Sequence, residues 1–392
     1  MITYHLSIWG VIIINSKERV LTTIAHKEPD RVPVGEWGID HDHVSRVLGR
    51  HTYWRNRKDT TLALWDNRRD EVVEGMKRDC VDIVNALDYD IVTVELVPPK
   101  SYHVDDKPRL VREGVWEDKS GNVFKYAASN DAIFPATFPE AKFELTDEDV
   151  ERAIEEADNI DPSEFELLDF VCDKFGKDKA ILFRGIDTYF KLLDPFGGGV
   201  EHQLMVTCIA PEEIRKLWPA CLKYNQALID HCAEKGVNII MSGHDYGMNT
   251  GCIMNPNTIR SEFFPMMKEV NCRINAIGKP AFFHCCGRVW DILDDFIDAG
   301  FVGYQSIQES AGMDNRRIKE MYGDKLTMWT GVQCETLILG SLEDTEKEVM
   351  KNMDLLMPGG GFIFGSTNSV QYGAKTDNYL RALELVRKYG VY

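Results

Sequence analysis

The chain has 392 residues, of which 44% are hydrophobic and 28% are charged. This length suits one large α/β barrel or two medium domains, and the near-average composition excludes wholesale disorder. The 63 acidic and 45 basic residues give a formal net charge of −18, so nucleic-acid binding would require a local basic patch. The densest basic stretch, residues 55–58, ends at Asp59. We therefore expect no nucleic-acid partner and attribute the acidic charge to solubility.

The most apolar stretch near the N-terminus is LSIWGVIII at residues 6–14. It is shorter than the ~18 apolar residues of a membrane span. It also lacks the preceding basic residues and the following cleavage site of a signal peptide. The ten cysteines are not spaced like a secreted disulfide framework. We expect a cytoplasmic protein without a membrane span, an N-terminal extension over residues 1–16, and a first helix that Ser16 caps.

Short apolar runs alternate with longer amphipathic stretches along the rest of the chain. The eight runs, one of them weak, lie at residues 32–34, 81–84 (the weak one), 180–183, 238–241, 281–283, 302–307, 326–330 and 361–364. Alternating strands and helices imply parallel strands with helical crossovers. Eight such units over this length predict a single (β/α)8 barrel over residues 17–392. The alternative fold is a doubly wound open sheet.

Two departures from simple alternation are expected. Residues 97–178 contain short pieces that are typical of antiparallel strands, at 102–104, 109–111 and 121–126, and we interpret this region as a small insertion on the barrel. A helical pattern begins at Pro211 and contains Pro219, where we expect a kink. Further helical patterns lie at 258–277, 289–299, 342–357 and 376–389.

In a barrel of this type the chemistry lies at the carboxyl ends of the strands. The corresponding segments here read GEW (35–37), RGID (184–187), GHDYG (243–247), HCCG (284–287), QSIQE (305–309), TGVQC (330–334) and GSTN (365–368). Polar and metal-capable residues therefore gather where a barrel would place its active site.

The segment HCCG contains the sharpest local signal. Residues i and i+2 of a strand share one side, so His284 and Cys286 could face a single ion while Cys285 turns away. Imidazole nitrogen and thiolate sulfur suit zinc, which takes three protein ligands in a catalytic centre. Cys334, Glu309 and His244 lie at other strand ends and are candidates for the third ligand. The alternative is a hydrogen-bonded histidine beside two buried thiols.

Several segments together resemble the uroporphyrinogen decarboxylase superfamily, and specifically its corrinoid-dependent methyltransferase branch. The matching segments run in order from about residue 17 to the end: HKEPDRVPV (26–34), GHDYG (243–247), FFHCCG (282–287), AGMD (311–314), KEMYGD (319–324), GVQ (331–333) and GGGF (359–362). The resemblance implies a (β/α)8 barrel, in agreement with the strand count.

The resemblance also separates two activities within the superfamily. True decarboxylases carry an arginine-rich loop after the first strand, which holds the carboxylates of the substrate. Here residues 33–40 read PVGEWGID, with no arginine and two acids, so porphyrinogen decarboxylation is not expected. The methyltransferases carry zinc on a His-x-Cys pair that matches His284 and Cys286. Their thiol-methylating members take a third ligand, a cysteine, from the last strand, and residues 360–366 contain none.

These considerations give a predicted site. His284, Cys286 and, ranked first as third ligand, Cys334 would hold zinc. Tyr246 and Glu36 would be catalytic and orient the substrate. Substrate-binding residues would be Trp37, Asp187, His244, Asp245 and Gln305. Two of these assignments have a structural alternative, because Asp187 could cap the helix that follows and Glu36 could be a structural carboxylate near Arg31.

The predicted function is transfer of a methyl group between a small methylated substrate and the cobalt of a corrinoid on a partner protein. The chain has no corrinoid-binding Asp-x-His-x-x-Gly segment of its own, so the cofactor would arrive on that partner. The acidic charge favours small neutral or cationic methyl donors. The alternatives are a lyase acting on a different small substrate and a non-catalytic relative that binds a corrinoid protein or a ligand. Homo-oligomerisation stays open.

Overall fold

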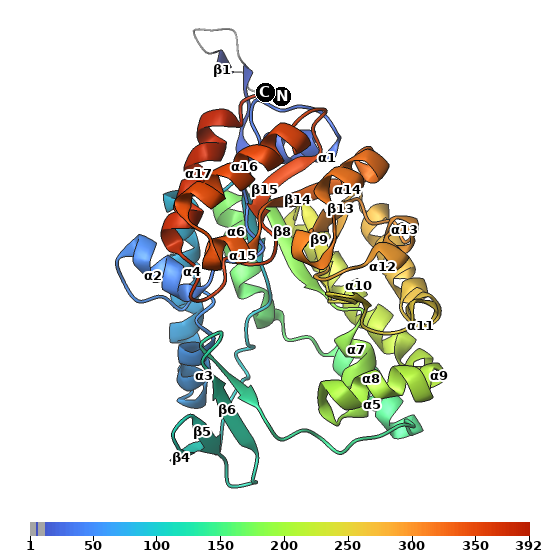
Figure 1. Cartoon of the computed structure of the whole chain (residues 1–392). Coiled ribbons are helices and arrows are strands. Elements are labelled where there is room, and N and C mark those ends of the chain that lie inside the picture. The colour runs from blue at the N-terminus through green and yellow to red at the C-terminus, as the bar shows by residue number, and fades with distance from the viewer. Residues whose placement is uncertain (1–4, 7–11) are drawn as a thin grey trace.

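The computed structural model describes residues 5–6 and 12–392 and shows a curled parallel sheet surrounded by helices (Figure 1). Within the described residues the main sheet has seven named strands, in the order β15-β14-β13-β12-β9-β8-β3. They are β3 (Ile91–Val94), β8 (Ala180–Ile186), β9 (Ile239–Gly243), β12 (Ala281–His284), β13 (Gly303–Gln305), β14 (Thr327–Val332) and β15 (Phe362–Ser366). All six pairings are parallel, as the alternating pattern predicts.

The segment around Val34 closes the sheet into a barrel. Val34 forms a parallel bridge with Phe364 of β15, and the Gly35 N–H donates to the Phe364 carbonyl over 3.1 Å. On its other side the Val34 carbonyl accepts from the N–H groups of Asp90 (2.7 Å) and Ile91 (3.4 Å) at the start of β3. The segment therefore bridges both edges of the sheet as the eighth strand, and the predicted (β/α)8 barrel is confirmed.

One of the eight predicted strands was placed wrongly. Residues 81–84 lie inside α4 (Arg69–Ala86), and the strand of this unit is β3, ten residues farther on. Cys80, Ile83 and Val84 are buried, at the three- and four-residue spacing of a helix face. The β-branched run of β3 supplies the strand.

Helices surround the barrel. α4, α6 (Glu166–Phe175), α10 (Trp218–Lys235), α12 (Phe264–Ala276), α13 (Leu293–Asp298), α14 (Asn315–Tyr322), α16 (Leu342–Leu356) and α17 (Thr376–Tyr389) form most of this layer. Pro219 lies in the first turn of α10, where its missing N–H costs no helical bond, so the expected kink is wrong. The pattern from Pro211 instead divides into α9 (Pro211–Ile214), a 3-10 turn (Arg215–Leu217) and α10. Within the described residues we find no helix long and apolar enough to cross a membrane.

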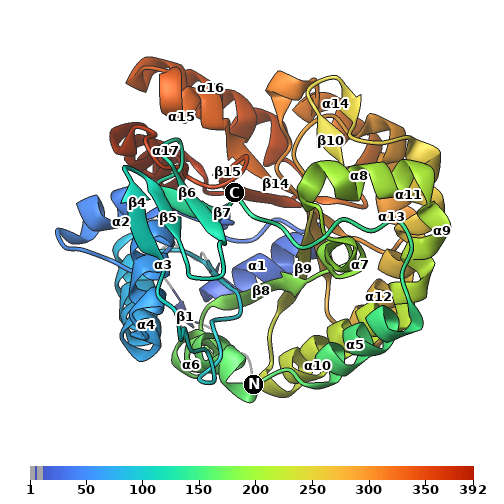
Figure 2. The same cartoon turned by 90° about the horizontal axis from the view of Figure 1, so that it is seen from below.

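The predicted insertion contains a four-stranded antiparallel sheet. Its strands are β4 (Arg109–Arg112), β5 (Val115–Glu117), β6 (Val123–Ala127) and β7 (Ala132–Pro135). In Figure 2 this sheet lies beside α2 (His41–Leu48), α3 (Arg57–Trp65) and α4, while α7 (Phe190–Leu193) and α8 (Gly199–Ile209) lie across the barrel from it. α6 contacts both β3 and β8, so it is the crossover helix of that unit although it falls within residues 97–178.

The barrel interior is filled by inward-facing side chains. One buried apolar cluster comprises Val20, Ile91, Ala180, Leu182, Ile239, Met241, Phe282, Trp329 and Ile363. Val20 belongs to α1 (Ser16–Ile24), which contacts β3, β8 and β15 and covers the amino-terminal end of the barrel. The N-cap of α1 is Asn15, in a capping box with Glu18, and not Ser16 as expected. Of the predicted extension 1–16, residues 1–4 and 7–11 lie outside the described residues.

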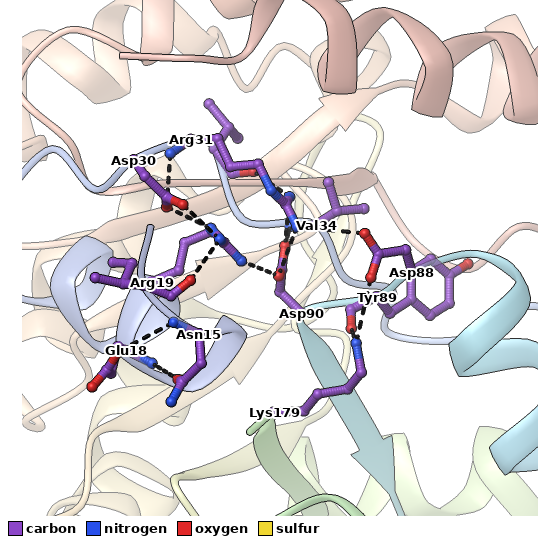
Figure 3. Close-up of polar contacts among 12 residues, drawn as sticks. Asn15, Glu18, Arg19, Asp30, Arg31, Val34, Asp88, Tyr89, Asp90 and Lys179 are labelled. Atoms are coloured by element: carbon purple, nitrogen blue, oxygen red, sulfur yellow. Dashed lines mark hydrogen bonds and ion pairs between the residues drawn. The ribbon is translucent and has the colours of Figure 1, made fainter. Parts of the chain in front are cut away.

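Buried ion pairs join α1 to the barrel at the amino-terminal end (Figure 3). Asp90, which is fully buried, accepts from Arg19 Nη1 (2.6 Å), Arg31 Nη1 (2.9 Å) and the Val34 N–H (2.8 Å). Arg19 also donates from Nε and Nη2 to the two carboxylate oxygens of Asp30, both over 2.7 Å. One carboxylate therefore connects α1, the eighth strand and β3.

Candidate active site

Strand alternation carries polar groups into the carboxyl-terminal mouth of the barrel. Phe282 and Leu182 belong to the interior cluster, and the residues two positions later, His284 and Arg184, therefore point into the mouth. His284 is 5% exposed and pairs in register with Gly243 of β9 and Gln305 of β13. The loop after β9 begins with His244 and Asp245, so the side chains at the ends of β9 and β12 lie close together.

Asp245, His284 and Cys286 form a cluster of potential metal ligands. Their ligand atoms lie within 4.8 Å of one another. The Sγ of Cys286 is 3.6 Å from His284 Nε2, and Asp245 Oδ1 is 3.7 Å from the same nitrogen. In a tetrahedral zinc site with bonds of 2.0–2.3 Å, ligand atoms lie about 3.3–3.8 Å apart. The donor types and their spacing therefore fit zinc.

Gln305 orients the His284 ring. Its side-chain oxygen bonds His284 Nδ1, and its amide nitrogen donates to the carbonyls of Ser366 (3.0 Å) and Asn368 (3.1 Å). The acceptor fixes the proton on Nδ1 and leaves the Nε2 lone pair facing the cluster. Gln305 was expected to bind substrate, but its side chain is fully buried and engaged, so it positions His284 instead.

Cys286 is surrounded by polar groups of the same mouth. Its sulfur lies 3.1 Å from Ser306 Oγ and accepts from the Asn368 amide over 3.0 Å, and its backbone N–H donates to Asp245 Oδ1 over 2.7 Å. Burial raises the pKa of the Cys286 thiol to about 12, and the Asp245 charge acts in the same direction. A bound cation would be required to hold this sulfur as a thiolate at neutral pH.

The three candidates for the third ligand lie outside the close cluster of Asp245, His284 and Cys286. Cys334 lines a hollow of about 150 Å³ with Cys286 and Asn368, but its own contacts are with the Ser369 carbonyl (3.6 Å) and Thr367 Oγ1 (3.7 Å). Glu309 pairs with Lys351, and His244 faces Asp187. The residue that the structure brings to His284 and Cys286 is Asp245, which we had expected to contact substrate.

Glu36 lies in the barrel wall. It is 4% exposed and accepts from the Ser366 N–H (2.9 Å) and Ser366 Oγ (2.6 Å), so it joins the eighth strand to the end of β15. Burial raises the pKa of Glu36 to about 8, against the lowering effect of its hydrogen bonds from Ser366 and Tyr379. These contacts correspond to the structural alternative, and the expected pairing with Arg31 is replaced by Ser366.

A second group lies around Tyr246 and His244. The His244 ring stacks on Tyr189 with centroids 5.4 Å apart, and its Nε2 lies 3.5 Å from Asp187 Oδ1. That same oxygen accepts the N–H groups of Tyr189 (3.0 Å) and Lys191 (3.2 Å), so Asp187 does cap the following turn. Within the described part of the chain, the Tyr246 hydroxyl and both His244 ring nitrogens are buried without a hydrogen-bond partner. Buried polar atoms of this kind normally have a partner, which can be a water molecule, an ion or a ligand.

Trp37 connects the metal-ligand cluster to two arginines. Its ring stacks on His284 with centroids 4.6 Å apart and an interplanar angle of 19°. The guanidinium carbon of Arg184 lies 4.2 Å from the Trp37 ring centroid, and that of Arg55 lies 5.2 Å from it. Sequence reasoning missed both arginines. The position of Arg184 at a strand end was an available signal, whereas Arg55 lay in a basic stretch that we interpreted as surface.

Comparisons with known proteins agree with this architecture. A solved methyltransferase from Methanosarcina mazei superimposes with a TM-score of 0.66 at 16% identity, covering 96% of this chain and 99% of that one, which establishes the shared fold. The methylcobamide:CoM methyltransferase MtaA of Methanosarcina barkeri is 24% identical over 207 residues. That match covers 51% of this chain and spans 58% of the length of MtaA.

The family model described as uroporphyrinogen decarboxylase (URO-D) matches residues 197–389, the segment that carries the Asp245–His284–Cys286 cluster. Residues 197–389 of this chain therefore resemble the uroporphyrinogen decarboxylase family, and the expected resemblance to that superfamily and its methyltransferase branch is confirmed.

Proposed function

We propose that this protein is a methyltransferase that moves a methyl group between a small methylated substrate and the cobalt of a corrinoid carried by a partner protein. The Asp245–His284–Cys286 cluster in the barrel mouth is the observation that carries the proposal. The similarity to MtaA, a relative named for methylcobamide, supports the corrinoid assignment. The barrel mouth, where the cluster lies, is where enzymes of this architecture perform chemistry.

We propose zinc as the metal, held by Asp245, His284 and Cys286. When bound, zinc would act as a Lewis acid on the atom that gains or loses the methyl group. The chain itself prepares the ligands: Gln305 directs the His284 lone pair, and the Ser306 hydroxyl and Asn368 amide surround the Cys286 sulfur. The third ligand in this proposal is Asp245 and replaces the expected Cys334.

The polar groups without partners are proposed to face the substrate. The Tyr246 hydroxyl and the His244 ring can donate a hydrogen bond to the methylated heteroatom, with Asp187 3.5 Å behind His244. Trp37 shields one face of His284 from water. Glu36 keeps a supporting role, because its carboxyl group is engaged by Ser366.

The test combines a metal measurement with a spectroscopic assay. Anaerobically purified protein should contain about one zinc ion per chain, as expected for a single catalytic site. Mixing it with a reduced corrinoid protein and candidate methyl donors should convert the Co(I) spectrum to that of methyl-Co(III). A panel of corrinoid proteins that is never methylated or demethylated would reject the methyltransferase assignment and favour the lyase alternative.

The ligand set has its own test. Asp245→Ala should lower zinc content and methyl transfer together, whereas Cys334→Ala should change neither by more than about twofold, because the Cys334 sulfur is engaged with Ser369 and Thr367. The opposite result, zinc loss only in Cys334→Ala, would restore the sequence-based ligand set.

A further inference from the structure

A cavity lies beside the metal-ligand cluster, between the barrel and its helices. It has a volume of about 80 Å³, several times the space that one water molecule needs. Its lining residues with polar groups are Glu36, Trp37, Arg55, Tyr89, Thr93, Glu95 and Arg184. Its apolar lining includes Met76, Ile83, Val84, Ile91, Val97 and Leu167. A small molecule with one polar end and an apolar body would match both parts.

Two buried N–H donors at the polar end have no partner among the described residues. They are Nη2 of Arg55 and Nε1 of Trp37. The Arg55 side chain is only 7% exposed, and its Nε already donates to Asp40 Oδ1 over 2.8 Å. A buried guanidinium nitrogen without an acceptor costs more than a neutral donor in the same position. Both unpaired groups are donors, so the missing partner is an acceptor.

The charges around the cavity indicate that this acceptor is an anion. Arg184 lies 12% exposed and forms an ion pair with Glu95. Burial lowers the pKa of Arg184, and the nearby Arg55 lowers it further, against the effect of Glu95. Arg55 and Arg184 each have one carboxylate partner, Asp40 and Glu95, and an anion bound between the two guanidinium groups would reduce the repulsion that remains between them.

The backbone is shaped to admit this arrangement. A Cβ atom on Gly38 would lie 2.6 Å from the guanidinium carbon of Arg55, so only glycine leaves room for the guanidinium at this position. Arg55 itself has a φ of +52°, a conformation that non-glycine residues rarely adopt. Arg55 therefore reaches the cavity lining from a turn with an unusual backbone conformation.

We infer that Trp37, Arg55 and Arg184 form an anion-binding subsite that takes the carboxylate of a small, apolar-bodied substrate. A planar carboxylate matches guanidinium donors in bidentate geometry, and the indole N–H adds a third donor. This inference rests on the proposed function for the identity of the ligand as the methylated substrate. It also revises our expectation of neutral or cationic donors, which considered only the overall acidic charge.

The test measures binding without using methyl transfer. Isothermal titration calorimetry with the complete zinc-loaded chain would compare benzoate, benzenesulfonate and benzamide as probes. We expect benzoate to bind at least about tenfold more tightly than benzamide, which has the same shape without the charge. Benzenesulfonate separates a carboxylate subsite from a sulfonate subsite, because tighter binding of the sulfonate would overturn the carboxylate assignment.

Variants identify the residues. Arg55→Gln and Arg184→Gln should each weaken benzoate binding by about 10- to 100-fold and leave benzamide binding nearly unchanged. Arg184→Lys keeps the charge without the planar fork and should recover part of the loss, and Trp37→Phe should lose several-fold. Arg112→Gln is the matched control, because Arg112 lies exposed on β4. Circular dichroism spectra would verify that each variant is folded.

The outcomes separate this inference from the proposed function. Equal loss of benzoate and benzamide in the arginine variants, or no binding of benzoate to the wild type, would overturn the anion subsite even if methyl transfer occurs. Arginine-dependent benzoate binding would support the subsite even if no corrinoid is ever methylated. In that case only the identity of the ligand as a methyl donor or acceptor would be lost.

Discussion

The two ends of the barrel differ in how completely their buried polar groups are paired. At the amino-terminal end, Asp90 accepts hydrogen bonds from Arg19, Arg31 and the Val34 N–H. Asp30 accepts hydrogen bonds from Nε and Nη2 of Arg19. At the carboxyl-terminal end, Arg55, Trp37 and His244 keep buried nitrogen atoms without partners among the described residues. Buried charged groups with partners stabilise the fold, whereas buried polar groups without partners at the barrel mouth can bind a ligand. The comparison predicts that mutations at the two ends affect different properties.

The largest effect is expected from loss of the metal ligands. His284→Ala and Cys286→Ser should each remove zinc and reduce methyl transfer by at least about 10³-fold, with the free energy of unfolding changed far less than at the opposite end. Elemental analysis and the Co(I) spectrum measure the two effects. His103→Ala and Cys272→Ser, at exposed positions, are the matched controls. Wild-type rates in either ligand variant would contradict the site assignment.

The opposite end should respond in stability. Asp90→Asn leaves Arg19 and Arg31 without a buried carboxylate partner and should lower the free energy of unfolding by about 3–5 kcal/mol. Urea titration measures this change, and zinc content per folded molecule should be unaffected. Asp377→Asn breaks the exposed pair with Arg46 and should cost less than about 1 kcal/mol. Equal effects of the two substitutions would show that the buried network is not what stabilises this end.

An intermediate effect is expected for the residue that orients His284. Gln305→Leu removes the acceptor on Nδ1 while filling a similar volume, so zinc affinity should fall by about 10- to 100-fold. Competition with a chromophoric chelator would measure the affinity. Gln305→Glu keeps an acceptor at this position and should retain more affinity than the leucine variant. If both variants bind zinc as tightly as the wild type, Gln305 has no positioning role.

A further effect concerns pH. Burial raises the pKa of Glu36 to about 8, from about 4.5 as its ordinary value. The native state therefore keeps a proton that the unfolded chain releases, so the contribution of this group to stability falls as pH rises from about 4.5 to 8. The slope for one such group is about 1.4 kcal/mol per pH unit. Glu36→Gln cannot ionise and should flatten the decline in urea midpoint between pH 6 and 8, whereas the exposed Glu320→Gln should not.

How far the sequence could predict this protein depends on the range of the interactions. The alternation of apolar runs is local, and it led to the correct barrel. It failed at residues 81–84, where a valine-containing segment belongs to the face of α4 and the true strand, β3, was overlooked. The two-residue spacing of His284 and Cys286 was also sufficient to expect neighbouring side chains, which lie 3.6 Å apart. These features depend on residues close together in the chain.

The rest of the site depends on contacts between distant segments. Asp245 reaches His284 because β9 and β12 pair in register, whereas Cys334, which we had ranked first for the softness of its sulfur, lies outside this cluster. Arg55 and Arg184 are 129 positions apart by their numbers, yet both guanidinium groups lie against Trp37. The two arginines contact the Trp37 ring only because the barrel is closed, and no pattern within either segment predicts this contact.

The bonds of Gln305 have a mechanical consequence. This side chain of β13 bonds the His284 ring of β12 and also donates to the carbonyls of Ser366, the last residue of β15, and of Asn368 just after it. β15 lies two strands from β13 on the side away from β12. The orientation of the His284 ring therefore depends on the end of β15, the strand that pairs with the segment around Val34 to close the barrel. If the Val34 segment and β15 separate upon heating, the His284 ring would lose its fixed orientation before the helices unfold. In a thermal titration, release of the bound metal would then precede the change in circular dichroism and would report the opening of the barrel.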